Sequence, residues 1–145
     1  MTDVVETLLR RAKSDDYSER ARAGTELSRF AGSEAVDQVL LKLLLDDDNT
    51  FPVRVTAEAL IKSGDRAALR PFAAGWHRAH SEVDSTHLSE IADYLYGATS
   101  YGLWLDSTDP QRTNLQTVLA TLLDDQDDAV RKGADSLLAV LPGIS

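Results

Sequence analysis

The sequence predicts an all-α protein of about eight helices, joined in chain order into about four helical hairpins. Leu and Ala, which are strong helix formers, dominate its apolar residues, and only four prolines and eight glycines interrupt the 145 residues. Apolar side chains recur at helical spacing along nearly the whole chain. The length suits one domain with an apolar core, so we expect a single domain over residues 1–145.

The first two hairpins are expected at residues 2–31 and 33–63. In the first, Asp15–Asp16 separates the two helices. In the second, Ser33 is placed to cap the first helix, and Pro52 is acceptable in the first turn of the second helix.

The last two hairpins are expected at residues 65–96 and 109–141, with an insertion at 97–108 between them. Gly64–Asp65 ends the fourth helix and begins the fifth, while Asp109–Pro110 begins the seventh.

A short motif recurs in the second helix of each expected hairpin. It is a small residue followed three positions later by Leu, which predicts a close helix approach beside a shared apolar core. The four instances are Gly24–Leu27, Ala57–Leu60, Ala92–Leu95 and Ala134–Leu137. Acidic turn residues precede each instance, and we expect them to cap helix N-termini and to complement the helix dipole.

Residues 47–60 and 124–137 share more than this motif, since each has an acidic turn, then Val-Arg, then Ala, then Leu. This pattern resembles the HEAT-repeat family, in the short bacterial form similar to the HEAT-like repeats of phycobilin lyases. The resemblance implies a right-handed α-solenoid with an Asp-to-Arg ladder between repeats. The chain departs from it in two repeats: Ala21, flanked by arginines, stands where the second repeat has Arg54, and the third repeat has Ser89. The ladder is therefore expected to be interrupted.

The insertion at 97–108 is rich in glycine and small polar residues, which is typical of a loop, yet it follows and contains several aromatic residues. Two interpretations remain open. The aromatic side chains seal the hairpin beneath the loop, or they form a recognition loop, since Tyr and Trp are enriched at binding hot spots. In the second interpretation Tyr94, Tyr101 and Trp104 contact a partner.

In a solenoid the second helices line an extended concave surface. Their solvent-facing stripe is predicted to carry a partner-binding set: Arg54, Glu58, Asp93, Arg131 and Asp135. The net charge is −9, and residues 73–145 hold 11 acidic against 4 basic side chains, net −7. This balance disfavours nucleic acid and favours a basic protein partner, for example a toxin masked by an immunity protein or antitoxin.

No catalytic motif is visible, so we expect a non-catalytic protein-binding scaffold without metal or cofactor. There is no Cys, no Gly-x-Ser-x-Gly sequence and no nucleotide-binding glycine motif. His77 and His80 lie three residues apart on one helix face and could bind a metal with Glu82 or Asp84, but that spacing is unspecific. The alternative is a HEAT-like enzyme or a lyase-type protein that handles a small molecule near residues 94–104.

The chain has no apolar run of the roughly 20 residues that span a bilayer, and acidic residues near its start argue against a signal peptide, so a cytoplasmic protein is expected. The apolar residues of the last helix cannot all face one neighbour: Leu137, Leu138, Val140 and Leu141. Either the C-terminal residues 142–145 fold over this helix, or a second copy packs there as a homodimer.

Overall fold

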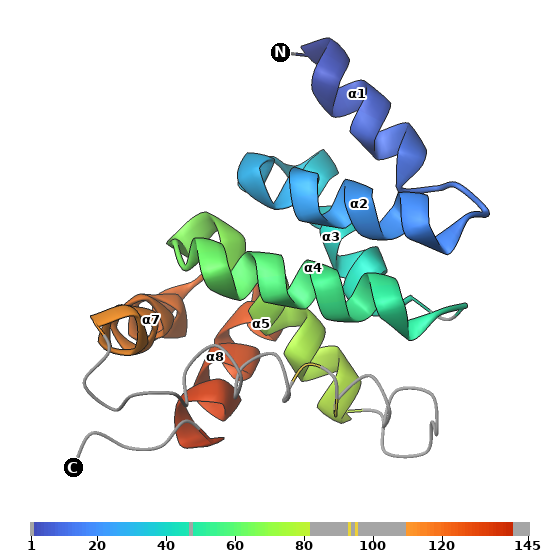
Figure 1. Ribbon diagram of the computed structural model, residues 1–145. Helices are drawn as coiled ribbons and strands as arrows, with labels where there is room; N and C mark the ends of the chain where they lie inside the picture. Colours follow the sequence, from blue (N-terminus) through green and yellow to red (C-terminus); the bar gives the residue numbers. More distant parts are fainter. Residues whose placement is uncertain (1, 47, 82–92, 94, 96–109, 141–145) are drawn as a thin grey trace.

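The computed structural model describes residues 2–46, 48–81, 93, 95 and 110–140, and this part of the chain is helical with connecting turns (Figure 1). Its α-helices are α1 (Thr2–Arg11), α2 (Tyr17–Leu27), α3 (Glu34–Leu44), α4 (Thr50–Ser63), α5 (Arg66–Ser81), α7 (Pro110–Thr121) and α8 (Asp128–Val140). Two 3-10 helices, η1 (Ser28–Phe30) and η2 (Leu122–Asp124), extend α2 and α7. The all-α prediction is confirmed for these residues. About eight helices were predicted, and seven are described; the sixth expected helix lies almost entirely outside the described residues.

Several helix ends lie where the sequence placed them. Ser33 caps α3, its hydroxyl accepting a hydrogen bond from the Val36 amide at 3.4 Å. Gly64 ends α4 in the left-handed conformation, with φ of +66°, which favours glycine. The carboxylate of Asp65 then accepts the Ala68 amide at 2.8 Å as α5 begins.

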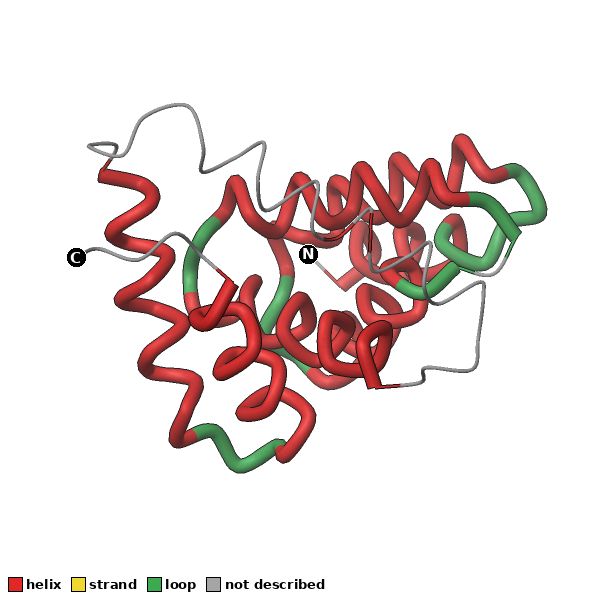
Figure 2. The backbone as a smooth tube through the Cα atoms, turned by 90° about the horizontal axis from the view of Figure 1, so that it is seen from below, coloured by secondary structure: helices red, strands yellow, loops and turns green. Residues whose placement is uncertain are grey.

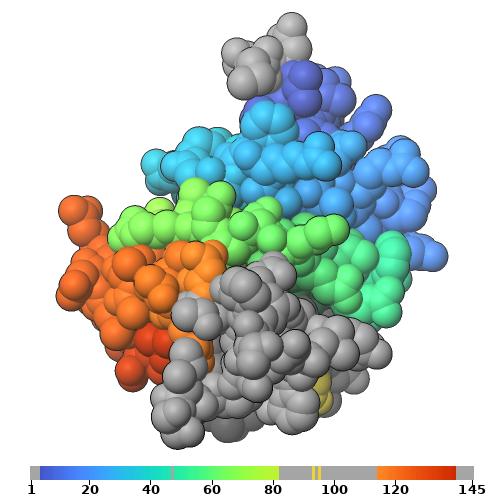
Figure 3. All heavy atoms as spheres, turned by 60° about the vertical axis from the view of Figure 1, so that its left-hand side comes forward, coloured from blue at the N-terminus to red at the C-terminus, as the bar shows by residue number. Residues whose placement is uncertain are grey.

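In Figure 1, α1 lies at the top, α2 and α4 follow below it, and α5, α7 and α8 lie together in the lower part. The space-filling view shows the first part of this order as bands that run from blue through green to orange (Figure 3). Helices α2 and α4 lie side by side and pack extensively, as do α5 and α8, and Figure 2 shows the short loops that join successive helices. The final helix α8 packs more extensively on α5 than on α7, its expected hairpin partner.

Two glycines mark the closest helix crossings. A Cβ on Gly24 in α2 would collide with the side chain of Thr56 in α4. A Cβ on Gly133 in α8 would overlap the backbone carbonyl of Ala73 in α5. Glycine is therefore required at Gly133, where the obstacle is backbone, whereas at Gly24 the Thr56 side chain would have to move.

The small residue and Leu of the recurring motif are buried wherever their side chains are described. Relative exposure is at most 1% for Leu27, Ala57, Leu60, Leu95, Ala134 and Leu137. The motif thus predicted core positions correctly. In α8 the closest backbone approach nevertheless falls on Gly133, one residue before the motif position Ala134.

Among the helices that the structure describes, none combines the length and the apolar character needed to cross a bilayer.

Candidate protein-binding surface

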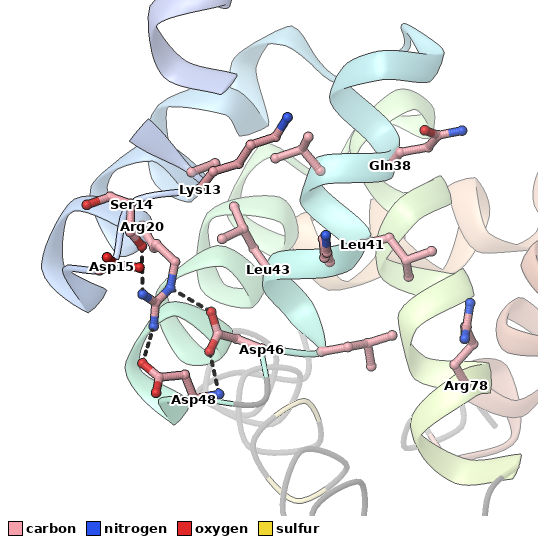
Figure 4. A pocket seen from close by; sticks show the side chains of 14 residues that line it. Lys13, Ser14, Asp15, Arg20, Gln38, Leu41, Leu43, Asp46, Asp48 and Arg78 are labelled. Carbon is pink, nitrogen blue, oxygen red and sulfur yellow. Dashed lines mark hydrogen bonds and ion pairs between the residues drawn. The ribbon is translucent and has the colours of Figure 1, made fainter. Parts of the chain in front are cut away.

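A buried arginine joins the first two hairpins. The Arg20 side chain, 10% exposed, extends from α2 to the turn between α3 and α4, where it meets Asp46 and Asp48 (Figure 4). Its Nε donates to Asp46 and its Nη2 to Asp48, each at 2.8 Å, while Nη1 donates to the Ser14 carbonyl at 2.8 Å. We call these contacts the Arg20 clamp. Burial disfavours the charged guanidinium, but the hydrogen bonds to Asp48 and Asp46 outweigh it, so the pKa of Arg20 lies above its usual value.

Asp46 also orders the turn that leads into α4. Its Oδ1 accepts the backbone amides of Asp48 and Asn49, both at 2.9 Å, while its Oδ2 binds Arg20. Asn49 in turn caps α4 by accepting the Phe51 amide at 2.8 Å. A chain of short polar contacts therefore runs from the buried arginine to the first turn of α4.

These contacts place two exposed aromatic rings together. Tyr17, three residues before Arg20, and Phe51, three residues after Asp48, meet edge to face with ring centroids 6.0 Å apart. The Arg54 guanidinium lies over the Phe51 ring, 5.6 Å from its centroid, and is 4.0 Å from Glu58. We call Tyr17, Phe51, Arg54 and Glu58 the aromatic–arginine cluster.

The cluster is unusual because its large rings remain accessible. Tyr17 is 47% exposed and Phe51 is 37% exposed, although rings of this size are normally well buried. The edge-to-face pair contributes about 0.5–1.5 kcal/mol, and an exposed cation–π contact about 0.5–1 kcal/mol. These energies hold the rings in a fixed arrangement without covering them.

A second set of ion pairs, the Asp125 clamp, lies in the turn between η2 and α8. The Asp125 side chain is 4% exposed and receives Arg70 from α5 through two hydrogen bonds of 2.7 and 3.0 Å, together with Arg66 at 3.2 Å. Its Oδ1 also accepts the Asp127 amide at 2.9 Å. The hydrogen bond from Arg70 is the largest cause that lowers the pKa of Asp125 from 3.8 to about 2, against the opposing effect of burial.

The acidic turn residues were expected to cap helices, and Asp16 does so at α2, where it accepts the Ser18 amide at 2.9 Å. The expectation is wrong for Asp48 and Asp125. Both accept arginine side chains, while Asn49 and Asp127 form the caps of α4 and α8. Asp48 lies two residues before α4 and Asp125 three before α8, and from there each side chain reaches the neighbouring hairpin instead of the first helical amides. The caps fall one or two residues closer to the helix.

The expected Asp-to-Arg contacts also differ in detail. In the first hairpin Arg20 makes the contact, one residue before the predicted position Ala21. Arg54 pairs within its own helix with Glu58 instead of reaching a described acidic turn. Arg131 binds the Asp125 carbonyl at 2.6 Å and Asp128 at 2.9 Å, so it closes its own turn.

The predicted partner-binding residues are brought together only in part. Arg54 and Glu58 are exposed neighbours within the aromatic–arginine cluster. Asp93 and Asp135 are exposed and Arg131 is half-buried, but α8 packs chiefly on α5, away from the α2–α4 pair. The three aromatic candidates lie outside the described residues: Tyr94, Tyr101 and Trp104.

Of the two histidines on α5, His80 takes part in packing. His80 stacks on Trp76 with centroids 4.2 Å apart, and its Nδ1 donates to the Trp76 carbonyl at 2.8 Å. Trp76 is buried and donates to the Ser136 hydroxyl at 3.0 Å, which ties α5 to α8. Within the described part of the chain, no group of His, Asp and Glu residues is arranged to hold a metal ion.

Sequence reasoning missed Tyr17 and Phe51. Tyr17 directly follows an acidic turn and Phe51 comes three residues after one, both at a helix start where an aromatic residue has no obvious core position, and that is the signal that could have singled them out. No protein-family model matches the chain, and a comparison with curated proteins finds no match.

Proposed function

We propose that this protein is a non-catalytic, protein-binding scaffold built of HEAT-like hairpins, and that it binds a partner through the aromatic–arginine cluster. The observation that carries the proposal is the exposed Tyr17–Phe51 pair with Arg54 over one ring. Tyr and Arg are among the residues most enriched at binding hot spots. The extensive packing of α2 beside α4, the second helices of the first two hairpins, supports the solenoid part of the proposal.

The cluster is suited to binding because it is already ordered. Association costs free energy to immobilise side chains, about 0.5–1.5 kcal/mol for each flexible one. Here the Arg20 clamp fixes the first turn of α4, and ring contacts fix Phe51 and Arg54. A partner would therefore cover the rings without first ordering them.

The net charge of −9 supports a partner that is basic overall, since opposite charge steers the two proteins together. An immunity or antitoxin role, in which this chain masks a basic toxin, is the specific version that we propose.

The test is affinity capture from the native cells, followed by calorimetry with the purified partner. The wild type is compared with Phe51→Ala and with Leu123→Ala. Leu123 is a matched control, since it is 40% exposed but lies in η2, outside the cluster. A hot-spot residue costs about 2 kcal/mol or more when truncated, so Phe51→Ala should weaken binding at least about 30-fold.

The control variant should bind as the wild type does, and circular dichroism should confirm that both variants are folded. Equal affinity of folded Phe51→Ala and wild type would remove the cluster from the binding surface. Failure to recover any stoichiometric protein partner would overturn the scaffold proposal itself.

A further inference from the structure

A groove lies beside α3, and no residue of the aromatic–arginine cluster lines it. Its walls are the end of α1 with the following turn, residues 12–15, and the last turns of α5 at Arg78 (Figure 4). Its volume is about 840 Å³. It meets a second hollow of about 430 Å³ toward the start of α3, and the two share Gln38 and Leu41. That second hollow also carries the carboxylates of Glu34, Asp37 and Asp127, so the name groove is kept for the first hollow alone.

The floor of the groove is apolar. Helix α3 buries Val36, Leu40 and Leu44 in the core, each at most 1% exposed. The half-buried side chains of Val39, Leu41 and Leu45 line the groove on its other side. Helix α3 and its C-cap residue therefore present apolar side chains both to the core and to the groove, and a ligand can cover those in the groove.

The rim of the groove is cationic, although the chain as a whole carries a net charge of −9. Lys13, Lys42 and Arg78 line it, are exposed, and form no ion pair with any residue that the structure describes. Each lies at or just beyond the C-terminal end of a helix, where a cation complements the helix dipole but stays accessible.

The acidic residues of the groove cancel these charges only in part. Asp46 and Asp48 are both engaged by Arg20 in the clamp. Asp15 is the one other carboxylate in the lining. The described lining thus holds four cations against three carboxylates, a formal charge of +1, and the three cations outside the clamp are exposed around an apolar floor.

We propose that this groove binds an acidic, amphipathic peptide segment of a partner protein. Apolar side chains of the segment cover Leu41 and Leu45, and its carboxylates pair with Lys13, Lys42 and Arg78. The proposal goes beyond the proposed function, since it assigns a second surface with the opposite charge preference. A nucleic acid fits less well, because its phosphate backbone would gain nothing from the apolar floor.

The test begins with a displayed library of random peptides of about 12 residues, a helical length that matches α3. The full-length protein is the bait. The recovered peptides should be rich in Asp or Glu and in Leu, Ile or Phe. Their affinity, measured by fluorescence anisotropy, should fall at least about tenfold in the double variant Lys42→Glu/Arg78→Glu and should weaken as salt rises from about 0.05 to about 0.3 M.

Matched controls separate the groove from general charge. Arg22→Glu/Arg29→Glu makes the same charge change at exposed residues outside the groove and should leave the affinity within about threefold. Leu41→Gln changes the floor without changing the charge and should also weaken binding. Circular dichroism checks that every variant is folded.

Three results would overturn the proposal. The first is a library that yields no binder, or only basic or wholly polar peptides. The second is equal affinity of the wild type and the groove variants. The third is displacement of the peptide by another occupant. That occupant would be an oligothymidine, or a second copy of this chain, in which case light scattering would show a dimer of the wild type and a monomer of Lys42→Glu/Arg78→Glu.

Discussion

Replacing Asp125 with Asn should destabilise the protein at neutral pH and remove part of its acid sensitivity. Asn keeps the shape, and its oxygen still accepts the Asp127 amide, but the change removes the charge and the Oδ2 acceptor that Arg66 and Arg70 share. Because the folded pKa of Asp125 is about 2 rather than 3.8, its ionised form contributes about 2 kcal/mol to stability at pH 7.

Losing one partner of a fully buried ion pair costs about 3–5 kcal/mol. Here the cost should be smaller, because the side chains of Arg66 and Arg70 are 52% and 32% exposed and regain water when the carboxylate is lost. We therefore expect Asp125→Asn to lower the free energy of unfolding by about 2 kcal/mol.

The pH dependence follows from the sign of the shift. A carboxylate whose folded pKa is lowered stabilises the protein above its unfolded pKa, and that stability is lost as pH falls through the folded pKa. The contribution of Asp125 should be complete above about pH 5 and mostly gone by about pH 2. The difference in the free energy of unfolding between wild type and Asp125→Asn should shrink as the pH falls from about 5 to about 2.

The assay is urea unfolding followed by circular dichroism at several pH values. Asp135→Asn serves as the control, since Asp135 is exposed on α8 and forms none of the ion pairs of the described residues. It should change stability by less than about 0.5 kcal/mol. If the difference in the free energy of unfolding between wild type and Asp125→Asn stays constant from neutral to acid pH, the reasoning is refuted, because the lost stability would then not come from ionisation of Asp125.

Three further substitutions test the packing and the turns by thermal or urea unfolding. Gly133→Ala should lower the free energy of unfolding by about 3 kcal/mol, because its Cβ meets the rigid backbone of α5. The control Gly75→Ala should change it by less than about 1 kcal/mol, because its Cβ meets a flexible leucine side chain. Equal effects of the two substitutions would contradict the close crossing at Gly133. Arg20→Met should lower the free energy of unfolding by at least about 2 kcal/mol, and the exposed control Arg22→Met should lower it by less than about 0.5 kcal/mol. Similar losses in the two variants would argue against the Arg20 clamp. Asn49→Ala should cost about 1 kcal/mol as a lost N-cap, and an unchanged stability would show that the cap contributes nothing.

Local features of the fold were predictable because their causes lie within a few residues of sequence. The left-handed conformation at Gly64 and the cap at Ser33 satisfy backbone groups of their own helices. Helical periodicity likewise located core leucines such as Leu27 and Leu60. These requirements are the same in any fold that uses the helix.

Contacts between hairpins were not predictable in the same way. Asp125 and Arg70 are 55 residues apart, and nothing near either one distinguishes an aspartate that caps a helix from one that receives a distant guanidinium. Gly133 was passed over for a related reason. Its importance comes from the crossing of α8 over α5, which follows from tertiary packing and not from the helical repeat.

The candidate binding surface depends both on the sequence pattern and on the packing between hairpins. Arg54 and Glu58 were found because they project from the repeat pattern, but their value for binding depends on Phe51 and Tyr17 beside them. Those rings meet because a buried arginine on one hairpin holds the acidic turn of the next. The Arg20 clamp therefore acts as a positioning element: removing it should loosen the ring pair and weaken partner binding even though Arg20 lies beneath the surface.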